Sequence, residues 1–154
     1  MDISGELIVA APREAVFDRL QDPRQFVALI DGVQDLTEIA PARYTALFET
    51  KVAYMRFKFK VAVEVVRMVR PQEIVAKIEG TPLGVVGRAS ATTVTTLSET
   101  PAGTQVNYSI TATITGKLGS IGQPVLRAKA KEMEAQFARN LRAVFAPDTT
   151  GSAS

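Results

Sequence analysis

Two-residue alternation of apolar and polar side chains runs through most of the chain between residues 33 and 115. It is clearest at 54–65, where one parity is apolar and the other mostly charged: Met55, Phe57, Phe59, Val61, Val63 and Val65 against Arg56, Lys58, Lys60 and Glu64. Such alternation is typical of strands with one buried and one solvated face. With turn residues between them, the segments predict strands at 34–40, 43–52, 54–69, 72–80, 85–98 and 104–115, after a first strand at 3–10.

Apolar residues at helical spacing predict three helices. Pro12 suits a first helical turn, and Val16, Phe17 and Leu20 follow on one face, which predicts a short helix at 12–21. Asp22-Pro23 ends it and starts a second short helix. A long helix is expected at 121–145, and its apolar stripe comprises Leu126, Ala130, Met133, Phe137, Leu141 and Val144. We expect its opposite side to face solvent with Lys129, Lys131, Glu132, Glu134, Arg139 and Arg142.

The order β-α-α-β×6-α indicates an α+β fold, in which a curved antiparallel sheet of about seven strands buries its apolar face around the long helix. One long helix does not fill the concave side of so wide a sheet. A cavity between sheet and helix is therefore expected, with the two short helices closing one end. The domain is predicted to span 1–145, and the small and polar residues 146–154 to form a flexible tail or the start of a linker.

The amino-acid composition limits the kinds of catalytic and metal site that the chain can form. The chain has no cysteine and no histidine, which removes the thiol nucleophile, the commonest general base and the commonest transition-metal ligand. Its net charge of +2 is too small for nucleic-acid binding to be the default interpretation, and little aromatic interleaving accompanies the outward cations. No basic leader or bilayer-length apolar run occurs, so we expect a non-secreted, soluble domain.

A glycine-rich turn, GKLGSIG at 116–122, separates the last strand from the long helix. Its glycines lie three apart, which matches neither G-x-G-x-x-G nor the phosphate-binding G-x-x-x-x-G-K-[ST]. We therefore expect a structural corner where the chain turns onto the concave face of the sheet. A hinge or gate for the cavity is the more specific alternative.

Two other features allow both a plain and a functional interpretation. The basic residues Lys51, Arg56, Lys58 and Lys60, with those of the long helix, form either a solvated face or a surface for an anionic membrane. The apolar loop GTPLGVVG at 80–87 is either a turn whose leucine caps the core or a pocket lip that contacts a partner.

No catalytic set emerges from the acidic or hydroxyl side chains. The strand carboxylates of Glu49, Glu64 and Glu79 fall on the outward parity, where paired carboxylates would lack a shared buried site. Tyr44, Thr50 and Tyr108 are the inward hydroxyls. Tyr108 is either a core tyrosine with a satisfied hydroxyl or a group that orients a ligand.

Strand parity and the helix stripe together predict the cavity wall. Its expected residues are Phe26, Leu29, Phe57, Phe59, Ile78, Tyr108, Ile110, Met133 and Phe137, with Leu83, Ile121 and Val125 at the mouth. We predict no catalytic residue and no metal ligand.

Three segments carry a family resemblance: GELIVAAPREAVFDRLQDP, VVGRASATTVTTLSE and GTQVNYSITATITGKLGSIGQPVLRAKAKEMEAQFARNL. Through them the chain resembles the START-like, Bet v 1-related (SRPBCC) superfamily of helix-grip proteins, and within it the CoxG family of carbon monoxide dehydrogenase subunits. The resemblance implies a helix-grip fold and a non-enzymatic protein with an apolar cavity. It also implies a menaquinone-type quinone or similar lipid as a non-covalent ligand, and molybdenum carbon monoxide dehydrogenase as the partner.

Members of this kind are tethered to the inner face of the cell membrane through a C-terminal extension, and residues 146–154 are where such an extension would continue. Two alternatives stay open. An assembly or membrane-recruitment factor for the dehydrogenase would use its surface and would tolerate a filled cavity. A polyketide cyclase-like enzyme, as found elsewhere in the superfamily, would need a buried acid or base.

Overall fold

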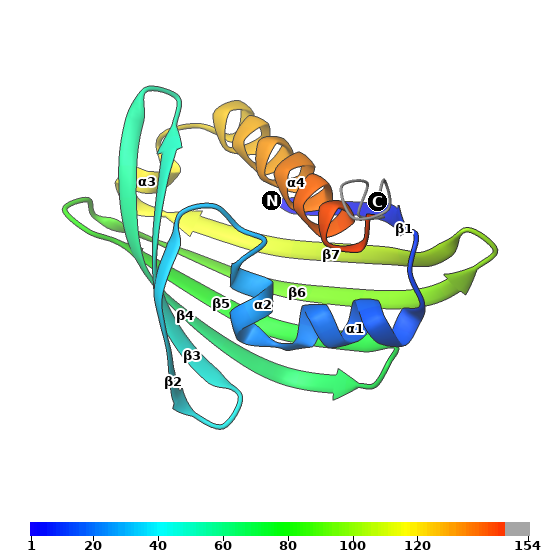
Figure 1. Ribbon diagram of the computed structural model, residues 1–154. Helices are drawn as coiled ribbons and strands as arrows, with labels where there is room; N and C mark the ends of the chain where they lie inside the picture. Colours follow the sequence, from blue (N-terminus) through cyan, green and yellow to red (C-terminus); the bar gives the residue numbers. More distant parts are fainter. Residues whose placement is uncertain (147–154) are drawn as a thin grey trace, which may run out of the picture.

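The computed structural model describes residues 1–146, and the predicted tail lies outside this range except for Ala146. Eleven elements follow one another along these residues (Figure 1). They are β1 (Asp2–Val9), α1 (Arg13–Gln21), α2 (Pro23–Val27), β2 (Val33–Ala40), β3 (Arg43–Val52), β4 (Met55–Val69), β5 (Glu73–Pro82), β6 (Gly87–Thr100), β7 (Gly103–Thr115), α3 (Gly116–Gly119) and α4 (Gln123–Phe145). The seven predicted strands, the two short helices and the long helix are confirmed.

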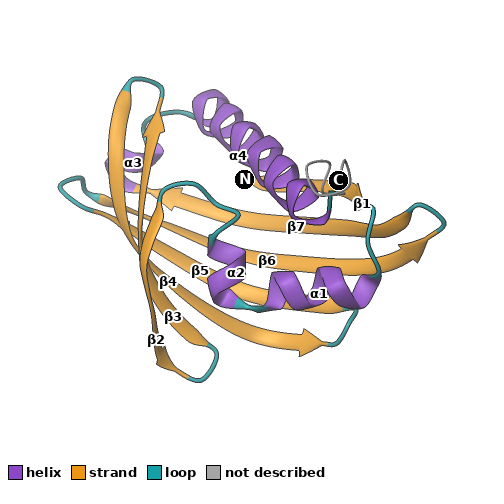
Figure 2. Ribbon diagram, viewed as in Figure 1, coloured by secondary structure: helices purple, strands orange, loops and turns teal. Residues whose placement is uncertain are grey.

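All seven strands form one antiparallel sheet in the order β1-β7-β6-β5-β4-β3-β2. Every neighbour in sequence from β2 to β7 is also a neighbour in the sheet, and β1 closes the edge beside β7. Figure 2 shows the sheet as one curved layer with α4 crossing its concave side. The predicted arrangement, a sheet curled around the long helix, is confirmed.

One hydrophobic cluster fills the end of the concave face that α1 and α2 cover. Val16 and Phe17 of α1 are fully buried there against Leu97 of β6 and Val106 of β7. Leu141 of α4 is also fully buried in this cluster, and the C-terminal half of the helix is thereby fixed to the core. Arg70, in the β4–β5 turn, pairs with Asp18 and stacks on the Phe17 ring, which secures α1 from outside.

A second, smaller cluster fills the opposite end. Val52 of β3, Phe57 of β4 and Leu118 of α3 are buried together, and Ile121 and Val125 pack against them. The start of α4 therefore rests on this cluster, as its end rests on the first.

The helix α3 differs from the prediction, which placed an irregular glycine turn at 116–122 and began the long helix at 121 rather than 123. Glycine has a low helix propensity, but tertiary contacts override it here. The Lys117 and Leu118 amides donate to the Val86 carbonyl, and Leu118 is buried between the strand ends. Gly116 takes a positive φ of 71° at the junction, which glycine adopts without strain.

Candidate functional site

The middle of the concave face lies between the two clusters and belongs to neither. Its side chains come from the central strands β4 to β7 and from β3, and they are half-buried: Ala46, Val61, Val63, Ile78, Ala91 and Ile110. Val63 pairs with Ile78, and Ile78 pairs with Ala91, so these positions form a continuous strip across the sheet. We call this strip of six residues the concave floor.

The helix α4 spans this floor and is held at its C-terminal half. Asn140 donates to the Leu29 carbonyl at 2.9 Å, and Gln136 accepts from the Asp31 amide at 3.3 Å. The backbone of α4 approaches the sheet most closely at β1 and β3, which lie at or near its two edges. The helix therefore contacts the sheet near its edges and at the two clusters, and the floor residues between these contacts are only half-buried.

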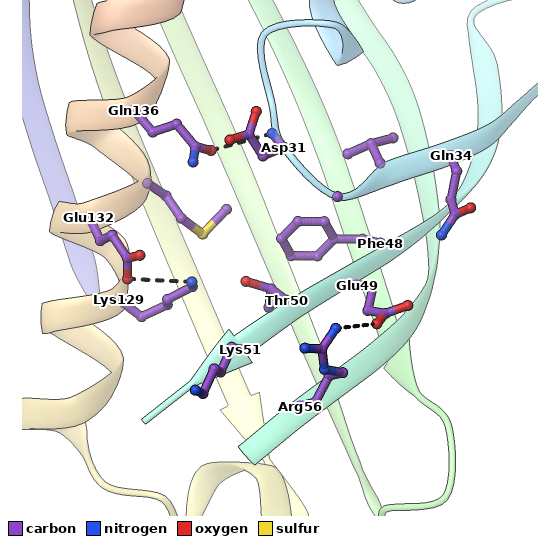
Figure 3. Close-up of a pocket in the computed structure, with 13 residues that line it drawn as sticks. Asp31, Gln34, Phe48, Glu49, Thr50, Lys51, Arg56, Lys129, Glu132 and Gln136 are labelled. Carbon is purple, nitrogen blue, oxygen red and sulfur yellow. Dashed lines mark hydrogen bonds and ion pairs between the residues drawn. The ribbon is translucent and has the colours of Figure 1, made fainter. Parts of the chain in front are cut away.

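A pocket of about 500 Å³ opens where α4 faces β3 and the α2–β2 loop (Figure 3). This volume is typical of a small-molecule site. Its lining comes from three segments: Asp31, Gly32, Val33 and Gln34 from the loop and β2; Phe48, Glu49, Thr50, Lys51 and Arg56 from β3 and β4; and Lys129, Glu132, Met133 and Gln136 from α4.

Four of the charged side chains at this pocket form two ion pairs, whereas Asp31 and Lys51, which also line it, form none within the described part of the chain. Lys129 Nζ lies 3.4 Å from Glu132 Oε2, and Arg56 Nη1 lies 3.0 Å from Glu49 Oε1 (Figure 3). Phe48 packs on Phe59 with ring centroids 6.1 Å apart. Because Phe48 also lines the pocket, the apolar surface of the concave face extends to the pocket wall. The pocket thus combines a polar rim with an apolar inner wall. Within residues 1–146 no cluster of three or more potential metal ligands occurs.

A second polar contact lies on the other side of α4. The Tyr108 hydroxyl of β7 donates to Glu134 Oε2 at 2.7 Å. Burial, followed by the hydrogen bond to Glu134, raises the pKa of Tyr108 to about 12. Gly5 of β1 makes room for this side chain, because a Cβ at that position would lie 2.3 Å from the Tyr108 hydroxyl oxygen. The Tyr108–Glu134 contact links the sheet to the middle of α4.

The sequence matches, over residues 5–146, the family model that describes CoxG, a subunit of carbon monoxide dehydrogenase. The chain belongs to the CoxG family. The resemblance inferred from the three sequence segments is therefore confirmed over almost the whole chain. No curated protein sequence matches the chain. Within residues 1–146, no helix is both long and apolar enough to span a bilayer.

Solved structures support the helix-grip fold of this CoxG-family chain. A conserved protein from Geobacillus kaustophilus is 24% identical, with a TM-score of 0.86, covering 94% of this chain and 95% of that one. A protein from Rhizobium leguminosarum is 13% identical, with a TM-score of 0.68, covering 93% and 95%. The di-domain ARO/CYC StfQ of the steffimycin biosynthetic pathway is 18% identical, with a TM-score of 0.66, covering 97% of this chain and 51% of StfQ. At these identities the likeness concerns the fold.

The residues predicted for the cavity wall and its mouth divide among five places. Phe26, Leu29, Tyr108 and Phe137 belong to the first cluster or pack against it, whereas Phe57, Phe59, Ile121 and Val125 do so at the second. Ile78 and Ile110 lie on the concave floor, and Met133 lines the pocket. Leu83 is 44% exposed at the β5–β6 loop. Their role as ligand contacts stays a prediction.

Two helix residues were wrongly assigned to the solvated side of α4. The Lys129 side chain is only 17% exposed and lines the pocket, and Glu134 turns toward the sheet to accept from Tyr108. Both lie next to the apolar stripe, and long side chains at its margins reach inward where the helix does not press on the sheet.

Sequence reasoning also missed part of the pocket. Phe48 shares the parity of Tyr44 and Thr50, so the alternation of β3 contained the signal for it. The loop residues 31–34 carry no comparable signal, because only the fold brings them to α4.

Proposed function

We propose that this CoxG-family protein carries an apolar small molecule, most simply a respiratory quinone of the menaquinone type, between α4 and the sheet. The observation that carries the proposal is the half-buried concave floor, which lies outside both packed clusters and beneath a helix supported near the sheet edges. The pocket of about 500 Å³ at the α4–β3 side supports it as a route to that floor.

The physical basis of binding is burial of the ligand's apolar tail. Each 100 Å² of apolar surface removed from water contributes about 2.5 kcal/mol, before the costs of association are subtracted. The floor offers alanine, valine and isoleucine side chains for this contact, and its alanines leave room. The Thr50 hydroxyl at the pocket suits an oxygen atom of the ligand, whereas the Tyr108 hydroxyl already donates to Glu134.

In the proposed function the protein neither makes nor breaks a covalent bond. Four ionisable side chains of the pocket support this, because Lys129 with Glu132 and Arg56 with Glu49 already form ion pairs at the rim. The partner that we propose is carbon monoxide dehydrogenase, on the strength of the family description. As the place of action we propose the inner face of the cell membrane, which follows from the family resemblance alone. In this scheme the carrier presents the quinone to the dehydrogenase for electron transfer.

The test is recovery of the ligand. Protein purified without detergent is extracted with organic solvent, and the extract is examined by mass spectrometry beside an extract from an unrelated protein of the same preparation. We expect a quinone or similar lipid at near one molecule per chain. Added menaquinone at about 100 times its Kd should raise Tm by roughly 5–10 °C. Absence of any apolar ligand, together with an unchanged Tm, would contradict the proposal.

A further inference from the structure

Three connections meet at the end of the molecule that holds the second cluster. They are the β3–β4 turn, the β5–β6 loop and the corner that contains α3 (Figure 1). The Leu83 amide donates to the Lys58 carbonyl at 2.8 Å, and the Lys117 amide donates to the Val86 carbonyl at 2.8 Å. Beneath them, Leu118 packs with Val52 and Phe57. We call residues 50–60, 80–90 and 112–120, which build this end, the loop end.

Large apolar side chains project from the loop end into solvent. Tyr54 of the β3–β4 turn is 86% exposed and Val86 of the β5–β6 loop is 75% exposed, and Met55 and Leu83 on the same two connections are about 40% exposed. Single exposed apolar residues are ordinary on protein surfaces. Four at the same end of the molecule, above a buried cluster that supports both connections, indicate a candidate contact surface.

The charged residues of the loop end are all basic. Residues 50–60, 80–90 and 112–131, which add the first turns of α4, contain none of the chain's 16 carboxylates and nine of its 18 basic residues. Those nine are Lys51, Arg56, Lys58, Lys60, Arg88, Lys117, Arg127, Lys129 and Lys131. Within residues 1–146, no carboxylate lies within salt-bridge distance of Lys51, Lys58, Lys60 or Lys117. Arg56, Arg88 and Lys129 pair with Glu49, Glu79 and Glu132, which lie just outside these ranges, so the other six basic residues carry the local excess. The chain as a whole is nearly balanced at +2.

We propose that the loop end docks on an anionic lipid bilayer. Tyr54, Val86 and Leu83 enter the interfacial layer, while Lys51, Lys58 and Lys117 contact the negatively charged headgroups. A bilayer fits better than a protein partner, because lysine is depleted from protein interfaces, whereas lysines around apolar tips are typical of membrane-surface binding. The proposal goes beyond the carrier function and does not depend on it.

Docking in this orientation places α3 and the first turns of α4 at the membrane. Ile121 and Val125 lie there against the second cluster, so the N-terminal half of α4, which the hydrogen bonds of Gln136 and Asn140 do not hold, faces the lipid. An apolar molecule leaving the bilayer would then meet the less restrained half of the helix.

Tryptophan fluorescence tests the orientation, because the chain contains no tryptophan. Val86→Trp reports from the loop end. Ile39→Trp is the matched control, since Ile39 is 62% exposed at the opposite end of the sheet, next to the β2–β3 turn. With vesicles of phosphatidylcholine and phosphatidylglycerol, we expect the emission of Val86→Trp to shift to shorter wavelength and to be quenched by brominated lipid. The emission of Ile39→Trp should not change.

Charge removal tests the lipid specificity in a sedimentation assay with the same vesicles. Lys58→Ala combined with Lys117→Ala should lower the partition coefficient at least tenfold, whereas Lys77→Ala with Arg24→Ala, which removes equal charge elsewhere, should leave it within twofold. Far-ultraviolet circular dichroism and Tm confirm that each variant folds. Equal binding to vesicles of phosphatidylcholine alone, no binding to either vesicle, or equal blue shifts in both tryptophan variants would overturn the proposal.

Discussion

Tyr108 is the residue whose surroundings most directly tie the helix to the sheet. Its hydroxyl donates to Glu134 of α4, and its ring occupies the space that Gly5 leaves open on β1. The plain interpretation of this tyrosine, a core residue with a satisfied hydroxyl, agrees with that geometry. A bound quinone carbonyl, which only accepts hydrogen bonds, would have to compete with Glu134 for the same proton.

Replacement of Tyr108 by phenylalanine should destabilise the protein by about 1 kcal/mol near neutral pH, since it removes one hydrogen bond and leaves Glu134 without its donor. The folded protein raises the pKa of Tyr108 to about 12, so folding favours the protonated phenol. The contribution of this protonated hydroxyl to the free energy of unfolding is therefore complete below about pH 10, the pKa of tyrosine in the unfolded chain. It is lost as the pH rises through 12.

Urea unfolding of wild type and Tyr108→Phe at pH 8 and pH 11 measures this. The difference in unfolding free energy between the two proteins should shrink at the higher pH. A difference that grows, or that is absent at pH 8, would show that the Tyr108–Glu134 bond does not stabilise the fold.

Some residues of the site lay beyond sequence reasoning for a physical reason. Parity along one strand or one helix decides which face a side chain occupies, and it placed Ile78, Ile110 and Met133 correctly on the concave side. It does not show how far α4 stands from the sheet. That separation is what allows Lys129 and Glu134 to turn inward.

At the scale of elements, the corner between β7 and α4 depends on close backbone approach. A Cβ at Gly119 would lie 2.9 Å from the Ile114 carbonyl oxygen, inside van der Waals contact with backbone that the β6–β7 ladder holds. Gly119→Val should therefore shift α3 and destabilise the protein by about 1–3 kcal/mol, the usual cost of overpacking.

The matched control is Thr113→Val, a change of similar size at an exposed position near the end of β7, which should stay within about 0.5 kcal/mol of wild type. Thermal unfolding of both variants checks the prediction. An unchanged Tm for Gly119→Val, with normal quinone uptake, would mean that the corner has room that the structure does not show.

The elements themselves were almost fully predictable, because each rests on a local pattern. The alternation at 54–65 and the stripe from Leu126 to Val144 are strong periodic signals. The elements predicted from them, a strand at 54–69 and a helix at 121–145, agree with the bounds of β4 and α4 within two residues. The exception is α3, whose glycines argue against a helix. It forms because the Val86 carbonyl, in the distant β5–β6 loop, accepts hydrogen bonds from the Lys117 and Leu118 amides, and no local pattern reveals such a partner.

At the scale of the whole molecule, packing is concentrated at two ends. The first cluster, with Phe17 and Leu141, fixes α1, α2 and the end of α4, while the second fixes α3 and its start. Between them lies the concave floor, whose side chains are only half-buried beneath α4. The two clusters fix the fold without a disulfide, since the chain has no cysteine, and they leave the floor as the surface on which we propose that a ligand binds.

The division also gives the molecule two unlike ends. The loop end carries the exposed apolar tips and the unbalanced lysines, whereas Asp18 and Arg70 form an ion pair at the α1 end. Neither the floor nor the loop end follows from net charge or composition, since both depend on which loops and strands the antiparallel order brings together.

The central claim is that the concave floor is the binding surface, and a single titration tests it most directly. Ala91→Phe places a large side chain on the floor, and Thr92→Phe places the same side chain on the exposed face of the same strand. If the floor is open, Ala91→Phe should fold with little change in Tm. If it were packed, the change would cost about 1–3 kcal/mol.

The Kd for menaquinone is measured from the quenching of intrinsic tyrosine fluorescence, for wild type, Ala91→Phe and Thr92→Phe. The account predicts that wild type and Thr92→Phe bind equally and that Ala91→Phe binds at least tenfold more weakly, a difference of about 1.4 kcal/mol or more. Equal Kd values for all three proteins, or no binding by any of them, would contradict it.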